Sequence, residues 1–190
     1  MFEGVLFSYE THPRDLSESA VYQVETLLRN LREIIPNIDK ARLMPRPGGI
    51  NGLILLDLRE CLQSMNIEAQ ESIRRQLTHF IEKAFDEGML LSIVKVRILN
   101  FIVPLDLDRL VETAKILAKK IRGRWKIELR TRKMADRMEI IRQVAAVIDQ
   151  PVDLKNPQFI LNIEILSKEL VVVYLVDKER ESETIIKPKY

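Results

Sequence analysis

Hydrophobic residues in the first half of the chain follow two different periods. Between Val21 and Ile35 they recur at intervals of three and four, which predicts an amphipathic helix that ends before Pro36. The same spacing returns over residues 68–87 and stops at Gly88, where a glycine commonly closes a helix. Short runs rich in β-branched and aromatic residues predict strands at residues 4–9, 41–44, 50–58 and 91–103. The resulting order, β-α-β-β-α-β, is that of a ferredoxin-like unit.

The second half of the chain predicts a further α/β unit. One helix opens near Asp108 and is expected to end at Gly123, and another follows residue 136. Three strands are predicted, at residues 125–131, 159–166 and 170–176. The last two are close enough in sequence to form a hairpin.

Strict alternation in the strand at residues 125–131 separates two faces. Trp125 and Leu129 lie on the apolar face, whereas Lys126 and Arg130 lie on the other. The tail at residues 177–190 instead alternates charges, and we expect it to fray.

Two helix starts carry the sequence of a capping box. Asp15 is followed three residues later by Glu18, and Asp136 is followed by Glu139. In such a pair each side chain accepts a hydrogen bond from a backbone N–H that the helix leaves unpaired.

Composition excludes several classes of protein. The chain has 190 residues, of which 46% are hydrophobic and 31% charged, as in a soluble globular protein with one or two domains. Its apolar runs are shorter than the ~18 residues that a membrane span needs, and its first residues do not resemble a signal peptide. A single cysteine allows no disulfide within the chain. We therefore expect a cytoplasmic protein.

The sequence offers little chemistry of its own. His12, His79 and Cys61 are too few for a four-ligand zinc site, and no acidic residue stands at a metal-ligand spacing from them. Cys61 is a nucleophile only if it meets a histidine in the fold, and a lone cysteine is more often a buried apolar residue. The glycines at 48, 49 and 52 form neither a dinucleotide fingerprint nor a P-loop, and predict a turn. No catalytic residue, cofactor or metal is expected.

Charge is distributed unevenly along the chain. The whole chain carries a net charge of only +2, but residues 115–142 contain 11 basic and three acidic residues, a net of +8. Lys115, Lys119 and Arg122 are spaced for one helix face, and the cations of the following strand share another face. A helix N-terminus near residue 136 also favours an anion. The predicted RNA-binding residues are Lys115, Lys119, Arg122, Arg124, Lys126, Arg130, Arg132, Lys133, Arg137 and Arg142.

An ordinary solvated basic face is the alternative to this interpretation. The acidic residues within the segment are too few to pair all its cations, which favours nucleic-acid binding. Trp125 is the one aromatic residue in the segment and is expected in the core rather than stacked on a base. We therefore expect contacts to the backbone and shape of a nucleic acid rather than to its sequence.

Several motifs in the second half together resemble a THUMP domain. They are the basic strand at residues 125–132, Glu139-Ile140-Ile141 on a helix, Val152-Asp153-Leu154 with Asn156-Pro157, and Asn162-Ile163-Glu164-Ile165. The likeness covers about residues 93–176, and members of this family carry a ferredoxin-like domain just before it. The resemblance thus implies an α/β (α+β) fold with a ferredoxin-like domain at residues 1–92, a THUMP domain at 93–180 and a charged tail at 181–190.

The resemblance also implies a function. THUMP domains are RNA-binding modules of tRNA-modifying systems, and in several systems they grip the acceptor stem and 3′ end. The 190 residues leave no room for the usual catalytic domain. The chain is therefore most similar to the stand-alone adapters that assist an RNA cytidine acetyltransferase in making N4-acetylcytidine in tRNA. Two alternatives stay open: a small RNA-modifying enzyme, and a protein–protein scaffold that uses its basic face.

Overall fold

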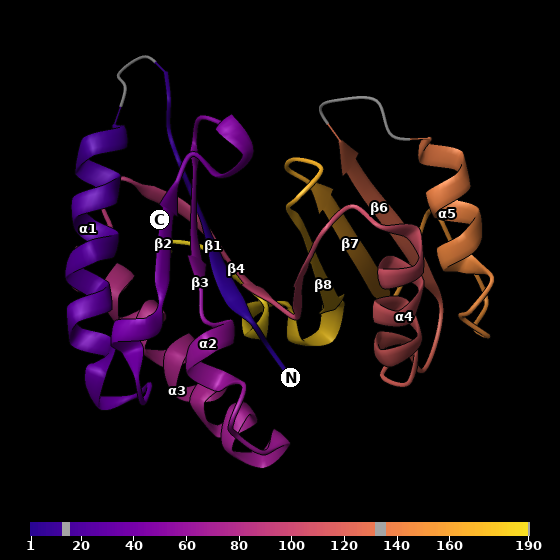
Figure 1. The fold of residues 1–190 in the computed structure, drawn as a ribbon, viewed down its shortest axis with the longest axis horizontal. Coiled ribbons are helices and arrows are strands. Elements are labelled where there is room, and N and C mark those ends of the chain that lie inside the picture. The colour runs from indigo at the N-terminus through magenta and orange to yellow at the C-terminus, as the bar shows by residue number, and fades with distance from the viewer. Residues whose placement is uncertain (13–15, 132–135, 190) are drawn as a thin grey trace. The chain divides into compact units, whose positions relative to one another are not determined.

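The computed structural model describes residues 1–12, 16–131 and 136–189. The chain forms two compact units, one made of Met1–Leu99 with Ser182–Tyr190 and one made of Asn100–Glu181. Each unit has its own sheet, and the fold is α+β, as the sequence predicts (Figure 1). In the part of the chain described here, no helix is long and apolar enough to cross a membrane.

The first unit contains a five-stranded antiparallel sheet in the order β2-β3-β1-β4-β9. Its strands are β1 (Gly4–Tyr9), β2 (Arg42–Pro45), β3 (Leu53–Asp57), β4 (Ile93–Leu99) and β9 (Ile185–Ile186). Its α-helices are α1 (Ser17–Asn30), α2 (Arg59–Leu62) and α3 (Ile67–Asp86). The predicted β-α-β-β-α-β order is confirmed.

One face of this sheet packs on α1 and α3. The pleat sends alternate side chains to this face, and their apolar groups are removed from water with those of the helices. The core contains Val5, Phe7, Ile54, Leu56, Val96 and Ile98 from the sheet, Val24 and Leu27 from α1, and Leu77 and Ile81 from α3.

The ends of the helices show where local signals operate. Asp15 lies outside the described residues, and α1 begins at Ser17 with no side-chain cap from Leu16. The Asn66 side chain caps α3 by accepting a hydrogen bond from the N–H of Ala69 at 2.8 Å. Gly88 has φ +73°, the left-handed conformation that favours glycine, and it closes α3 as predicted.

The single strand predicted at residues 91–103 is wrong, because the chain forms two strands there. β4 pairs with β1 in the first sheet, and β5 (Phe101–Val103) pairs with β8 in the second. Asn100 separates them: its N–H donates to the carbonyl of Val173 at 3.0 Å, and its side chain accepts from the N–H of Leu175 at 2.8 Å. Residues 93–99 therefore lie in the first unit and not in the second, because their backbone partners are there.

The C-terminal residues also differ from the frayed tail that we expected. After the 3₁₀ segment at Lys178–Glu183, β9 pairs with β4, and Ile186 is only 3% exposed. Arg74 of α3 donates to the carbonyl of Glu183 and to the Thr184 hydroxyl, both at 3.2 Å. The charged residues of this segment flank two adjacent isoleucines, Ile185 and Ile186. Burial of the Ile186 side chain holds the segment against the rest of the first unit.

The second unit contains a four-stranded sheet in the order β5-β8-β7-β6, in which only the β6–β7 pairing is parallel. Besides β5, its strands are β6 (Trp125–Thr131), β7 (Phe159–Ile165) and β8 (Val171–Asp177). Its helices are α4 (Leu107–Ala118) and α5 (Arg137–Ala145), which contact each other (Figure 1). Trp125 is 1% exposed and its indole N–H donates to the carbonyl of Gln150 at 2.8 Å, which confirms its place in the core.

The end of α4 corrects one expectation about the cations. The helix ends at Ala118, with Lys119 as its C-cap, so Arg122 lies in the following loop and not on the helix face of Lys115. Gly123 has no left-handed backbone and does not close the helix. A Cβ at Gly123 would lie 2.2 Å from the Gln158 side-chain oxygen, so a larger residue there would require the flexible end of the Gln158 side chain to move.

The anchored C-terminal segment yields a matched test. Ile186→Ala removes a buried side chain and should lower the free energy of unfolding by about 2–4 kcal/mol. Ile185→Ala, at the half-buried neighbour, should cost less than about 1 kcal/mol. Urea denaturation followed by circular dichroism measures both. Equal, small losses of unfolding free energy in both variants would show that β9 does not contribute to the stability of the first unit.

Candidate nucleic-acid interface

Strand β6 divides the predicted cations into two groups. The loop from α4 enters β6 at Trp125, and the segment toward α5 leaves it at Thr131. Six residue steps at ~3.3 Å place these ends about 20 Å apart. Lys119, Arg122 and Arg124 lie near the first end, whereas Arg130 and Arg137 lie near the second. The predicted cations that fall within the described residues therefore do not converge on one point.

Three cations at the first end are free of acidic partners. Lys119, Lys120 and Arg122 are exposed, and none of them forms an ion pair with any residue in the described ranges. We call these three residues the α4–β6 cluster. Because no carboxylate neutralises them, their charge is available to an anion from solution.

Arg124 lies next to this cluster but is already engaged. Its guanidinium lies 3.3 Å from the carboxylate of Asp153. That carboxylate also accepts hydrogen bonds from the N–H groups of Asn156 and Lys155, at 2.9 and 3.0 Å. The backbone N–H of Asn156 is the main cause that lowers the pKa of Asp153, and Arg124 adds to it. Asp153 thus stabilises its loop through these two backbone hydrogen bonds.

The polar face of β6 carries an ion-pair network rather than free cations. Lys126 lies 2.8 Å and Arg130 3.5 Å from the carboxylate of Glu128, and Arg130 also lies 3.8 Å from Glu164 of β7. Tyr174 of β8 donates its hydroxyl hydrogen to the same Glu164 at 2.6 Å. The hydrogen bond from Lys126 is the main cause that lowers the pKa of Glu128.

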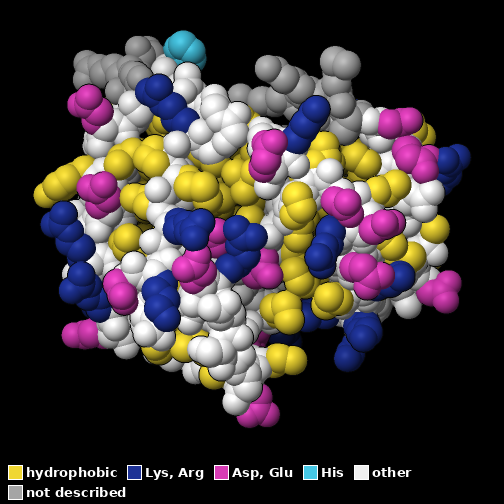
Figure 2. Space-filling model, viewed as in Figure 1, with side chains coloured by type: hydrophobic (Ala, Val, Ile, Leu, Met, Phe, Trp, Pro, Cys, Tyr) yellow, Lys and Arg dark blue, Asp and Glu magenta, His cyan; other side chains and the backbone are white. Residues whose placement is uncertain are grey.

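The helices contain two further pairs. Lys115 lies 2.8 Å from Glu112 on α4, and Arg142 pairs with Glu139 on α5. The expectation that acids are too few to pair the cations is therefore wrong for Lys115, Arg124, Lys126, Arg130 and Arg142. Glu112, Asp153 and Glu164 lie outside residues 115–142, so a count along the segment misses them. On the face shown in Figure 2, Lys and Arg side chains accordingly alternate with Asp and Glu.

The start of α5 is also less open to an anion than we expected. The Asp136 carboxylate accepts a hydrogen bond from the N–H of Glu139 at 3.1 Å, which confirms this half of the capping box and places a negative charge at the helix N-terminus. Arg137 donates to the carbonyl of Leu129 at 3.1 Å. Arg132 and Lys133 lie outside the described residues.

Two cations that the sequence did not single out lie near the first end of β6. Lys178 donates its backbone N–H to the carbonyl of Gln158, and Gln158 in turn donates to the carbonyl of Arg124. Lys155 lies in the loop that Asp153 stabilises. Both lysines are exposed. Only strand pairing brings residues 124, 155 and 178 to one edge, and spacing along the chain contains no such signal.

The cysteine and the two histidines could act as a nucleophile or as metal ligands. Cys61 is fully buried, and burial is the main cause that raises the pKa of its thiol, so its reactive thiolate is disfavoured. His12 and His79 are both exposed. Among the described residues, no three or more His, Cys, Asp or Glu side chains are grouped to hold a metal ion.

No protein-family profile matches the chain, and no curated protein matches it either. Solved structures do match. One is a 4-thiouridine synthetase–RNA complex with bound ATP, with a TM-score of 0.56 and 16% identity over 93% of this chain and 42% of that one. Another is PH1313 from Pyrococcus horikoshii OT3, with a TM-score of 0.58 and 18% identity over 92% of this chain and 55% of that one.

A smaller match is the THUMP domain of THUMP domain-containing protein 1, with 23% identity and a TM-score of 0.30 over 39% of this chain and 91% of that one. The chain spans about half the length of the two larger structures. At these identities the two larger matches show the fold alone. The chain is therefore similar in fold to these two proteins.

The network on β6 predicts a pH dependence of stability. Because folding lowers the pKa of Glu128 from its ordinary 4.5, the unfolded state binds more protons in acid, and stability falls as pH drops below that value. Glu128→Gln should therefore lose less stability than the parent between about pH 5 and pH 3. Fluorescence of Trp125, the only tryptophan, reports unfolding of this unit.

Glu33→Gln is the matched control, because Glu33 is exposed and has no ion-pair partner within the described ranges. It should reproduce the acid profile of the parent. Identical profiles for all three proteins would contradict a contribution from Glu128.

Burial of Cys61 predicts an unreactive thiol. At neutral pH an aromatic disulfide reagent should modify the native protein at least about a hundredfold more slowly than the urea-unfolded chain, because the thiolate forms only on opening of the core. Absorbance of the released thiolate follows both rates. Equal rates would make Cys61 a candidate nucleophile again.

Proposed function

We propose that this protein is a tRNA-binding adapter of a tRNA-modifying system. The observation that carries the proposal is the α4–β6 cluster, three exposed cations without acidic partners in the described residues. The cluster belongs to a fold shared with a synthetase whose structure contains RNA. Phosphate groups are the ligands that such cations attract most strongly in a nucleic acid.

The second unit favours recognition of RNA backbone and shape. Its four aromatic residues are Phe101, Trp125, Phe159 and Tyr174, and all are at most 7% exposed. Proteins that bind single-stranded bases on a sheet need exposed aromatic rings for stacking. Since none is exposed here, contacts to phosphate and sugar must dominate, and such contacts carry little information about base sequence.

We further propose that the protein presents tRNA to a separate RNA cytidine acetyltransferase. The support is the likeness of residues 125–165 to THUMP motifs, and in particular to the stand-alone adapters of tRNA acetylation. The burial of Cys61 supports a non-catalytic role, because its reactive thiolate is disfavoured.

Deletion of the protein in its native cell separates the two parts of this proposal. Mass spectrometry of digested tRNA should then show loss of N4-acetylcytidine. Loss of a different modified nucleoside would keep the tRNA-binding role and remove the acetyltransferase partner. Sequencing of RNA crosslinked to the protein should return tRNA, and recovery of no tRNA would contradict both parts.

The α4–β6 cluster gives a direct binding prediction. A triple variant, Lys119→Ala, Lys120→Ala and Arg122→Ala, should weaken tRNA binding. It should also flatten the slope of log K against log salt by about 2–3, because each lost phosphate contact contributes ~0.7–0.9. Filter binding or fluorescence anisotropy across a salt series measures both. The loss should be similar for tRNAs of different sequence.

A second triple variant is the matched control. Lys115→Ala, Lys126→Ala and Arg142→Ala removes the same charge from cations that are already paired with acids, so it should change the slope less. Arg130→Ala, Arg132→Ala and Arg137→Ala tests the far end of β6. A loss confined to this last variant would put the RNA surface at that end, and unchanged binding in all three would contradict a phosphate-binding role for the second unit.

A further inference from the structure

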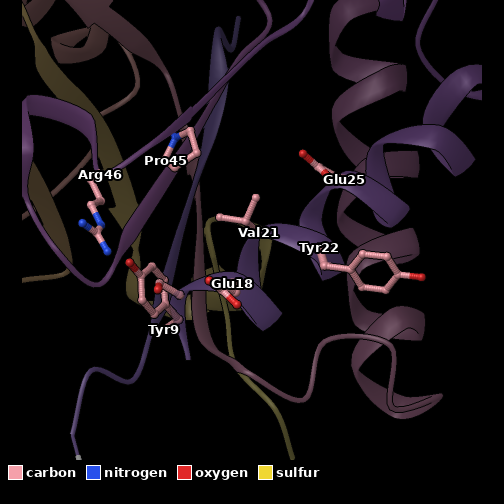
Figure 3. A pocket seen from close by; sticks show the side chains of 8 residues that line it. Tyr9, Glu18, Val21, Tyr22, Glu25, Pro45 and Arg46 are labelled. Atoms are coloured by element: carbon pink, nitrogen blue, oxygen red, sulfur yellow. The ribbon is translucent and has the colours of Figure 1, made fainter. Parts of the chain in front are cut away.

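The first unit has a groove that plays no part in the RNA binding proposed for the second unit. It has a volume of about 350 Å³ and lies between α1 and the turn that follows β2. Val21 and Glu25 of α1 face Pro45 across it, and the Arg46 guanidinium is turned toward Tyr9 (Figure 3). Most of its lining is apolar, although it is open to solvent.

Backbone hydrogen bonds hold the wall opposite α1 in place. Arg46 has φ +53° and donates its N–H to the carbonyl of Leu53 at 3.0 Å, and Tyr9 donates to the carbonyl of Gly52 at 3.0 Å. Gly52 has φ +83°, and a Cβ there would lie 3.3 Å from the Tyr9 carbonyl oxygen. The groove is thus preformed, which lowers the entropic cost of filling it.

The helix side of the groove is acidic. Glu18 and Glu25 are seven residues apart on α1, so they lie on one side of the helix, two turns apart. Both are exposed, and neither forms an ion pair with a residue in the described parts of the chain. Between them, Tyr22 is 65% exposed, an unusual position for a large aromatic side chain.

We propose that this groove docks a basic peptide segment of a partner protein, in which a bulky aliphatic residue is flanked by Lys or Arg. The aliphatic side chain contacts Val21 and Pro45, and the flanking cations pair with Glu18 and Glu25. Tyr22 adds an aromatic face at the rim, which attracts a guanidinium or ammonium group. Aromatic side chains are enriched in protein interfaces for this reason and for their large contact area.

A nucleic acid fits this groove poorly. Glu18 and Glu25, which have no cationic partner among the described residues, repel phosphate, whereas they attract Lys and Arg. The two carboxylates on the helix side of the groove are opposite in charge to the α4–β6 cluster and favour a different ligand, and Arg46 on the other wall leaves the lining with one net negative charge. The proposal does not depend on the RNA-binding role of the second unit, and each can fail separately.

Defined peptides test the proposal on the full chain. The probe is a nine-residue peptide with a central leucine, two flanking lysines and two flanking arginines, completed by glycine and serine and capped at both ends. One control peptide has glutamate at the four basic positions, and another has serine for leucine. Nuclear magnetic resonance of the ¹⁵N-labelled protein should show shifts at residues 17–25 and 45–53 with the first peptide only.

Charge-reversal variants then test the contacts. Glu18→Lys with Glu25→Lys should weaken binding of the basic peptide at least about tenfold, as expected for the loss of two pairs and the gain of two repulsions. Tyr22→Ala should also weaken it. The matched control, Glu33→Lys with Glu68→Lys, changes the same charge at exposed sites outside the groove and should alter affinity less than about twofold.

Three results of these experiments would overturn the proposal, and a fourth comes from competition with tRNA. They are equal binding of the basic and acidic peptides, shifts confined to residues outside the groove, and equal effects of the two double variants. Displacement of the peptide from the groove by tRNA would also overturn it, because RNA would then be the occupant. Loss of tRNA binding in the α4–β6 variants with peptide binding retained would leave this proposal intact.

Discussion

Backbone hydrogen bonding at Asn100 determines how the whole chain is divided. A strand that leaves one sheet must satisfy its polar groups in another, because a buried N–H without a partner costs free energy comparable to a lost hydrogen bond. Asn100 meets this requirement within a single residue, since its N–H and its side-chain oxygen both bind groups of β8. The apolar run at residues 91–103 therefore supplies one strand to each of the two sheets, β4 to the first and β5 to the second. The C-terminal strand β9 then returns to the first sheet and completes it beside β4.

Pairing of charges is the second constraint, and it separates structural cations from available ones. On β6, Lys126 and Arg130 share Glu128, and Glu164 links the same network to Tyr174 of β8. A cation held in this way has already exchanged water for a carboxylate, so a phosphate must compete with that carboxylate. No carboxylate among the described residues pairs with the α4–β6 cluster. The cluster lies just after the last residue of α4, in the segment that leads to β6. Free charge, rather than total charge, identifies the surface that favours an anion.

The two units present chemically different features. In the second unit, free cations lie at one end of β6 and every aromatic residue is buried. In the first unit, Glu18 and Glu25, which have no ion-pair partner among the described residues, and the exposed Tyr22 lie beside a mostly apolar groove. The proposed adapter role needs two kinds of surface, one for RNA and one for a partner protein, and these features are the candidates that we propose for each. The matching solved structures do not show which ligand each unit binds, because the likeness is one of fold and extends over about half of their length.

The sequence by itself determined the fold class and most of the helices and strands. The helical spacing at Val21–Ile35 and the strict alternation at residues 125–131 are local periodicities. They can be recognised without knowing which distant residues pack against them. The cap at Asp136 and the glycine at residue 88 are local for the same reason.

Only the tertiary structure decided the break at Asn100, the docking of Ile186, and which cations are free. Glu164 reaches Arg130 from a neighbouring strand, and Asp153 reaches Arg124 from a distant loop. Such partners are close in space and far apart along the chain. Hydrogen bonds and ion pairs depend on distance in space, so no pattern within a short window of sequence contains them.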